Sequence, residues 1–317
     1  MPGLQGYVVE MPSSELDDLF QNDLIEYIEK DTIAKAAKIP KGSEVTHPPT
    51  KRAMTSQYSA PWGLARISHR IRGHWDYYYD SSAGACVRVY GANFIPSSPD
   101  ADDDGHGAYV AGIVAGKTYG VTKKATVVAV KVLGNAGTGT MSGLLQGLNW
   151  AVADARERGV ARRAVINMSL TGAYTQSVND GVRAATDVGL TVVAAAGNDN
   201  SSAADWSPAS APAAITVGAI DRDDRRAEVS NWGAVVDVFA PGVQIVSASN
   251  SSDSATASMS GTSMAAPHLA GLAVYFIAME GLSGSAAVTE RILDVATKGV
   301  RDTQGAGDRI GYNAGGT

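Results

Sequence analysis

Short apolar runs alternate with longer amphipathic segments along most of this chain. Residues 127–132 form a continuous apolar run of strand length, and apolar side chains recur at helical spacing over residues 144–157. A continuous apolar strand is typical of a parallel sheet covered on both faces. The pattern continues with predicted strands at residues 164–170, 190–195 and 235–239 and predicted helices at residues 177–188 and 262–279. This alternation predicts an α/β fold with a doubly wound parallel sheet and helices on both faces.

The first 55 residues follow a different pattern. Residues 32–55 contain Lys, Pro, Gly and Thr without an apolar period, which is typical of a linker. We therefore predict a small α/β segment at residues 1–31, a linker at residues 32–55 and one large domain at residues 56–317. Within the small segment the pattern predicts strands at residues 7–10 and 25–29 and a helix at residues 14–20.

Composition narrows the class of protein. The chain has 317 residues, 44% of them apolar, and 35 glycines, which fits a well-packed, turn-rich globular protein. The net charge of −6 gives no basic surface for nucleic acid. The longest apolar stretch, residues 269–279, is too short to span a bilayer and predicts a buried helix. We expect neither nucleic acid nor a membrane among the partners.

Cysteine content and the N-terminal residues bear on localisation. Cys86 is the only cysteine, so this chain forms no intrachain disulfide. The N-terminal residues lack a basic region followed by an apolar run, as a secretory signal would have. Both features favour an intracellular, cytoplasmic location.

Three polar residues stand in patterns suited to acyl chemistry. Ser263 follows Gly261 and Thr262 and opens a predicted helix, where backbone N–H groups favour negative charge. His106 lies between two glycines, which allow close backbone approach. Asn198 follows a predicted strand, and the suitability of its amide for an oxyanion is implied by resemblance to a known family alone. The alternative roles are an N-cap serine, a packed histidine and a turn asparagine.

These segments resemble a known family. The sequences at residues 60–68, 104–107 and 260–268 closely resemble the N-terminal, histidine and serine signatures of subtilisin-like serine proteases of the proteinase K-like branch. The resemblance covers nearly all of the chain from Gln57 onward, and residues 1–31 resemble the end of an inhibitory propeptide that is normally over twice as long. It implies the subtilisin-like fold, with Ser263 as nucleophile, His106 as general base and Asn198 in the oxyanion hole.

Two glycine-containing segments match the strands that clasp an extended peptide in that family. Main-chain pairing of this kind provides affinity for a peptide. The alternative is that both are ordinary loops at strand ends. The implied substrate-binding residues are Gly137, Thr138, Gly139, Met141, Ser169, Leu170, Thr171 and Gly172.

The family's catalytic aspartate has no counterpart in the matching strand. Gly91 stands at that position, and the 15 positions between Gly91 and His106 are roughly half the family's spacing, so a segment has been excised. In trypsin and subtilisin themselves, losing this group costs about 10⁴-fold in rate. Asp100, Asp102, Asp103 and Asp104 precede His106, but a polar run of this kind is usually a solvated loop. The candidate residues that either line the remodelled site or fill core are Tyr90, Asn93, Phe94 and Tyr109.

A calcium site is implied by the family resemblance alone. The matching positions are the carbonyls of Pro212 and Ala214 and the carboxylate of Asp237, and oxygen ligands suit calcium. The alternative is an acidic residue in a surface turn. The sequence indicates no required cofactor beyond this structural calcium.

Three functions remain open. The favoured one is a repurposed enzyme that uses Ser263, His106 and Asn198 on a small molecule, by cyclisation, isomerisation or acyl transfer in a biosynthetic route. The second is a weak peptidase or esterase that uses a Ser–His dyad on a peptide substrate. The third is a non-catalytic binding module whose own N-terminal propeptide-like segment covers the site.

Overall fold

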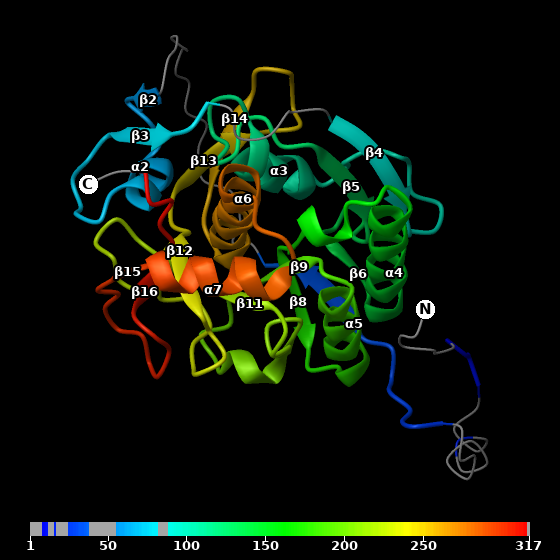
Figure 1. The fold of residues 1–317 in the computed structure, drawn as a ribbon. Helices are drawn as coiled ribbons and strands as arrows, with labels where there is room; N and C mark the ends of the chain where they lie inside the picture. Colours follow the sequence, from blue (N-terminus) through cyan, green and yellow to red (C-terminus); the bar gives the residue numbers. More distant parts are fainter. Residues whose placement is uncertain (1–7, 12–15, 17–24, 38–54, 82–87, 316–317) are drawn as a thin grey trace.

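A parallel sheet forms the centre of the computed structural model (Figure 1), which describes residues 8–11, 16, 25–37, 55–81 and 88–315. Its six strands run in the order β15-β16-β12-β11-β9-β7, and all neighbours from β16 to β7 are parallel, while β15 and β16 are antiparallel. The strands are β7 (Val165–Met168), β9 (Thr191–Ala195), β11 (Ile215–Ile220), β12 (Val238–Pro241), β15 (Thr297–Lys298) and β16 (Arg309–Ile310).

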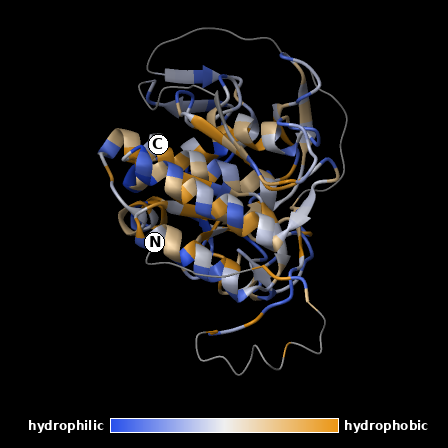
Figure 2. Ribbon diagram, turned by 90° about the vertical axis from the view of Figure 1, so that its right-hand side faces the viewer, coloured by the Kyte–Doolittle hydropathy of each residue, from blue (hydrophilic) through white to orange (hydrophobic). Residues whose placement is uncertain are grey.

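Helices cover both faces of this sheet because its strands are apolar on both sides. In β9, Val193 and Ala195 lie in the core shared with helix α6, and Val192 and Ala194 lie in the core shared with α4 and α5. The doubly wound α/β fold is thereby confirmed, and the hydropathy of its helices is shown in Figure 2. The helices are α2 (Trp62–Ser68), α3 (His106–Ala115), α4 (Met141–Glu157), α5 (Gln176–Asp187), α6 (Thr262–Glu280) and α7 (Ser285–Val295), with short 3₁₀ turns η2 (Ala161–Arg163) and η3 (Ala203–Asp205).

Helix α6 is the core of the molecule. By length and composition it is apolar enough to cross a bilayer, but 83% of its most apolar 18-residue window is buried in the fold. It packs against the strands β7, β9, β11 and β12. Residues 269–279 therefore form the buried helix that their sequence predicts.

The remaining strands form smaller sheets around this core. Strand β1 inserts between β6 and β8 and is antiparallel to both (Figure 1). The others pair as β2 with β3, β4 with β5, β8 with β10 and β13 with β14. These strands are β1 (Ile33–Ala36), β2 (Thr55–Tyr58), β3 (Asp76–Tyr79), β4 (Arg88–Asn93), β5 (Val127–Lys131), β6 (Thr138–Thr140), β8 (Leu170–Ala173), β10 (Trp206–Ser207), β13 (Ile245–Ala248) and β14 (Thr256–Met259).

The sequence was misleading for the N-terminal segment. Residues 8–10 and 25–29 form no strand, and the strand lies instead at residues 33–36, within the predicted linker. The predicted helix at residues 14–20 falls almost entirely outside the described residues. The apolar–polar alternation at residues 25–29 does not mark a strand, because this stretch runs past the starts of two helices. Glu29 accepts from the backbone of Gln176 and Ser177 at the start of α5, and Asp31 accepts from Ser142 at the start of α4.

Two strand boundaries also differ from the prediction. The strand predicted at residues 164–170 breaks at Ser169, where the chain leaves the central sheet and β8 pairs with β1. The strand predicted at residues 235–239 begins at Val238, because Val236 is held in a turn by the Gly233 carbonyl. Both shifts are local, and the order of elements is as predicted.

A buried tyrosine joins α3 to the β13–β14 hairpin. The Tyr109 hydroxyl accepts from the Met259 N–H at 2.9 Å and donates to the Ile245 carbonyl, and its side chain is fully buried. Replacing Tyr109 with Phe leaves both backbone groups without this partner. We expect Tyr109→Phe to lower the free energy of unfolding by about 1–3 kcal/mol in chemical denaturation. Tyr58→Phe, at an 80% exposed position, should change it by less than about 0.5 kcal/mol, and equal losses in both variants would contradict this role.

Candidate active site

Ser263 lies in the first turn of α6, fully buried and in contact with the chain's own N-terminal segment. Its backbone N–H donates to the Ala37 carbonyl at 3.1 Å. Its hydroxyl donates to the Ser169 carbonyl at 2.9 Å, and Ser169 Oγ donates back to the Ser263 carbonyl at 2.9 Å. The one hydroxyl proton of Ser263 is thus directed at a backbone carbonyl in this structure.

Asn198 lies beside this serine with its side chain held by the start of α6. Its Oδ1 accepts from the Thr262 N–H at 2.9 Å and from Thr262 Oγ1 at 3.1 Å. Its Nδ2 is buried, and among the described residues it has no hydrogen-bond partner. A Cβ placed on Gly261 would lie 2.8 Å from both Asn198 Nδ2 and the Ala37 carbonyl oxygen. The amide and the Ser263 N–H therefore flank one position, where they can stabilise a negatively charged oxygen.

Strand β1 occupies a groove between two segments that the sequence singled out. Ala34 and Lys35 pair with Gly139 and Thr138 of β6, and the Ala36 N–H donates to the Gly137 carbonyl at 2.9 Å. This is antiparallel pairing of an extended segment with the edge of β6.

The other wall of the groove is β8. Lys35 pairs with Thr171, Ala36 pairs with Leu170, and the Ala37 N–H donates to the Ser169 carbonyl at 3.4 Å. Gly172 is needed here, because a Cβ would lie 2.2 Å from Met141 Cε and 2.8 Å from the Ile33 carbonyl oxygen. The structure thus gathers all of the predicted peptide-clasping residues around one extended segment.

His106 is the first residue of α3 and is 6% exposed. The helix start is fixed by Asp102, whose carboxylate accepts from the backbone N–H groups of Gly105 and Ala108 at 2.8 and 2.5 Å. A carboxylate at this end of a helix also suits the positive end of the helix dipole. Asp102 therefore positions the helix that carries His106.

The acids before His106 have other contacts. Asp103 forms an ion pair with Lys131, and this bond lowers the pKa of Asp103. Asp100 accepts from Asn93 Nδ2 at 3.0 Å. Together with the capping role of Asp102, these contacts engage three of the four acids in shaping the loop.

Gly91 lies at an irregularity in β4, between Tyr90 and Ala92, where the register with β5 shifts. A Cβ at Gly91 would lie 2.4 Å from the Ala129 carbonyl oxygen, 2.8 Å from Val128 Cγ1 and 3.1 Å from Trp150. A side chain at this position would thus collide with β5 and α4. Gly91 is therefore a packing requirement at this irregularity of β4.

Of the four residues proposed to line a remodelled site, the three with described side chains have other contacts. Tyr109 is a core residue bonded to the β13–β14 hairpin, so its predicted substrate contact is wrong. Asn93 shapes its own loop through the Ser98 carbonyl and the Ile95 N–H. The Phe94 ring approaches Gly147 of α4. Tyr90 pairs through its backbone with Ala129, and its side chain lies outside the described residues.

The structure brings the three implied calcium ligands into one region. Asp237 Oδ2 accepts from the Thr216 N–H at 2.8 Å, two residues after Ala214, which ends the turn containing Pro212. Burial raises the pKa of Asp237, while Arg309 opposes that shift. Two carbonyls and one desolvated carboxylate make an oxygen donor set that fits a hard cation.

The contacts of Ala37, Glu29 and Asp31 were missed by sequence reasoning. Residues 33–37 contain one polar residue, Lys35, among four apolar ones, so they carry no alternating strand signal. Acids preceding distant helices carry no local capping signal, because capping is recognised only in adjacent sequence. The partner segments lie more than 100 residues away along the chain.

Comparisons with known proteins agree with this geometry. The model of the subtilase family, Peptidase S8, matches residues 42–312. Subtilisin-like protease 2 of Pseudogymnoascus destructans is 42% identical over 99% of this chain and 79% of its own length. Alkaline protease 1 of Aspergillus flavus is 41% identical over 97% of this chain and 77% of its own. The solved structure of a cold-adapted subtilisin-like serine proteinase superposes with a TM-score of 0.76 and 33% sequence identity. The match covers 81% of this chain and 99% of the proteinase chain.

Because a side chain at position 91 would clash with β5 and α4, we expect that an aspartate placed there does not increase activity. We expect Gly91→Asp to lower the free energy of unfolding by about 1–3 kcal/mol without raising the rate of peptide-ester hydrolysis. Gly91→Ala, which introduces the Cβ alone, should show a similar stability loss. A rate increase of about 100-fold or more in Gly91→Asp would contradict this account, because it would place the new carboxylate against His106.

Proposed function

Because this chain belongs to the subtilase family, we propose that it is a self-covered serine peptidase with a weak Ser263–His106 dyad, whose cleft accepts extended peptides. One observation carries the proposal: the Ala37 carbonyl receives the Ser263 N–H while β1 pairs with both walls of the groove. This is the position of a peptide bond presented for attack. Two relatives, named as a subtilisin-like protease and an alkaline protease, support the same reaction class.

Each retained group has a role in the proposed reaction. Ser263 Oγ adds to a peptide carbonyl carbon, and its proton passes to His106. The resulting oxyanion accepts from the Ser263 N–H and from Asn198 Nδ2. His106 then gives the proton to the departing amine, and water releases the acyl group by the same route in reverse. This cycle requires the Ser263 hydroxyl to turn from the Ser169 carbonyl to the imidazole.

We propose that the activity is weak because no carboxylate at position 91 orients the imidazole of His106. The family's carboxylate holds the imidazole in one tautomer and stabilises its protonated form, and in trypsin and subtilisin its loss lowers the rate about 10⁴-fold. Gly91 supplies no such group. We propose activity reduced by that order relative to a subtilase with a complete triad.

The peptide cleft favours a peptide substrate over the small molecule that the sequence favoured. Antiparallel main-chain pairing on two sides recognises an extended backbone, whatever its side chains. A repurposed enzyme acting on a small molecule has no use for both walls of this groove. A small-molecule enzyme remains the alternative function, and assays with peptide substrates distinguish the two.

Activity should rise when β1 is displaced. Ala34 is fully buried in the core cluster that includes Met141 and Leu170, whereas Ile33 is 60% exposed. A charge placed against the buried apolar wall is costly. We expect Ala34→Asp to increase the hydrolysis of a chromogenic peptide ester by at least about tenfold, and Ile33→Asp to leave it unchanged.

Ser263→Ala provides the control for that experiment. Combined with Ala34→Asp, it should abolish the increase, because the nucleophile is lost. Hydrolysis that persists in the double variant would refute the role of Ser263. No hydrolysis in Ala34→Asp, together with tight binding of a peptide of sequence Ile-Ala-Lys-Ala-Ala, would make the protein a binding module.

Calcium at Asp237 is a second part of the proposal. The pKa of Asp237 is raised by burial, so its contribution to stability is fully present at low pH and is lost as the pH rises through the folded pKa. A bound cation would offset that loss. At neutral pH we expect Ca²⁺ to raise the Tm of the wild-type chain, and EDTA to reverse the effect.

Asp237→Asn separates the two effects. The Asn side-chain oxygen can still accept from the Thr216 N–H, but it carries no charge to desolvate. In EDTA, the variant should melt at or above the wild-type temperature, and Ca²⁺ should shift it by less than half of the wild-type increase. An equal Ca²⁺ shift in both proteins would show that the ion binds elsewhere.

A further inference from the structure

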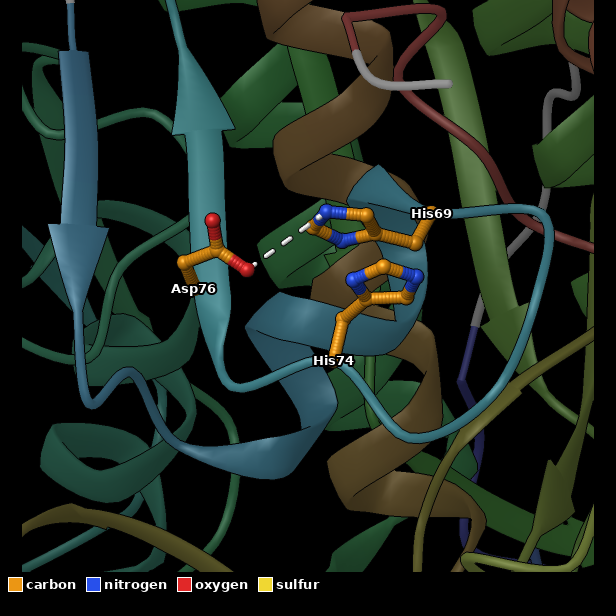
Figure 3. Close-up of side chains that lie close together, drawn as sticks. All are labelled: His69, His74 and Asp76. Carbon is orange, nitrogen blue, oxygen red and sulfur yellow. Dashed lines mark ion pairs between the residues drawn. The ribbon is translucent and has the colours of Figure 1, made fainter.

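Three potential metal ligands converge near the end of α2. His69 follows α2, Asp76 begins β3, and His74 lies in the exposed loop between them (Figure 3). One ligand atom from each residue lies within 4.8 Å of the others. The three residues span only eight positions, so a bound ion would close this loop.

His69 is buried and directs its Nε2 at Asp76. Its Nδ1 lies 3.0 Å from the Ala65 carbonyl oxygen and 3.1 Å from Ser68 Oγ, and these two contacts hold the ring in place. Nε2 lies 3.6 Å from Asp76 Oδ1, and His69 is 2% exposed. When Nδ1 donates to the Ala65 carbonyl, the electron pair of Nε2 faces the carboxylate and is available to a cation.

The 3.6 Å separation favours a metal ion. A charge-assisted hydrogen bond between a nitrogen and a carboxylate is ordinarily about 2.7–2.9 Å long. Zinc bonds of about 2.0–2.2 Å to nitrogen and oxygen, at a tetrahedral angle, place those atoms roughly 3.3 Å apart. The observed gap between Nε2 and Oδ1 is therefore close to that of two ligands of one ion.

His74 supplies the third ligand. Its ring stacks on His69 with centroids 4.0 Å apart and planes 6° apart, and it is exposed. An exposed side chain can tilt to point a nitrogen at the ion. His74 also lines a surface hollow of about 180 Å³ together with Trp75 and the arginines Arg66, Arg72 and Arg222. Two imidazoles, one carboxylate and an open fourth position form a known type of zinc coordination.

The surroundings support the ligands. The Tyr78 ring packs edge-on against the His69 ring with centroids 5.2 Å apart, which helps to hold the imidazole in place. The nearby arginine Arg72 pairs with Asp223 and Asp224. Its charge is thereby directed away from Asp76.

We infer that His69, His74 and Asp76 form a Zn²⁺ site that fastens the exposed loop of residues 70–75 to the end of α2 and the start of β3. Imidazole ligands suit Zn²⁺ and disfavour Ca²⁺ and Mg²⁺. The site is separate from the Asp237 region and needs no part of the catalytic machinery.

Isothermal titration of the full-length chain with Zn²⁺ tests the site. We expect one ion per chain, an affinity at least about tenfold weaker in His74→Ala and in Asp76→Asn, and an unchanged affinity in Ile71→Ala, an exposed position in the same loop. Asp237→Asn should also leave Zn²⁺ affinity unchanged. Zn²⁺ should raise the Tm of the wild-type chain and of Ile71→Ala, but not of His74→Ala.

Two results would overturn the inference. One is equal Zn²⁺ affinity in the wild-type chain and His74→Ala, since the ion would then bind elsewhere. The other is the absence of binding at about 1 mM Zn²⁺, which would make the three side chains a polar cluster without a metal. A Tm of metal-free His74→Ala close to that of the metal-free wild-type chain verifies that the variant is folded.

Discussion

The main-chain ladder that holds β1 between β6 and β8 places the Ala37 carbonyl against the Ser263 N–H. The geometry of the site depends on it: Ser263 is fully buried with this carbonyl at its backbone, and the glycine at position 172 is required by the strand that passes over it. Acidic caps from the same segment, Glu29 at α5 and Asp31 at α4, fasten the approach to the ladder. The same contacts of β1 therefore cover Ser263 and shape its surroundings.

Gly91 is a packing constraint on β4. It lies where the register with β5 shifts, and a Cβ there would lie 2.4 Å from the Ala129 carbonyl oxygen. The loop that follows is shaped by Asp102 and Asp103, which cap α3 and pair with Lys131. The strands that pair with β1 are different elements, β6 and β8. The contacts that hold β1 are therefore separate from the packing around Gly91.

Much of this was predictable from sequence where the signal is local. The apolar runs identify β5, β9 and α6, and the glycine-flanked segments identify the groove walls. The role of Tyr109 was not predictable, because its hydroxyl meets Met259, 150 positions away. Strand β1 was missed because a four-residue segment acquires a strand conformation only through partners far along the chain. The boundary at Val238 moved because the Val236 N–H donates to the Gly233 carbonyl in a turn.

Native-state amide hydrogen exchange of the full-length Ser263→Ala chain tests the central claim most directly. The Ala36 N–H donates to the Gly137 carbonyl in the ladder, so it should exchange on the order of 10³-fold or more slowly than in an unstructured peptide. The Ser263→Ala substitution keeps the backbone N–H that meets Ala37 and removes any cleavage after that residue. Exchange of Ala36 at the rate of an unstructured peptide, in a chain whose α6 amides remain protected, would mean that the cleft is open and that the account is wrong.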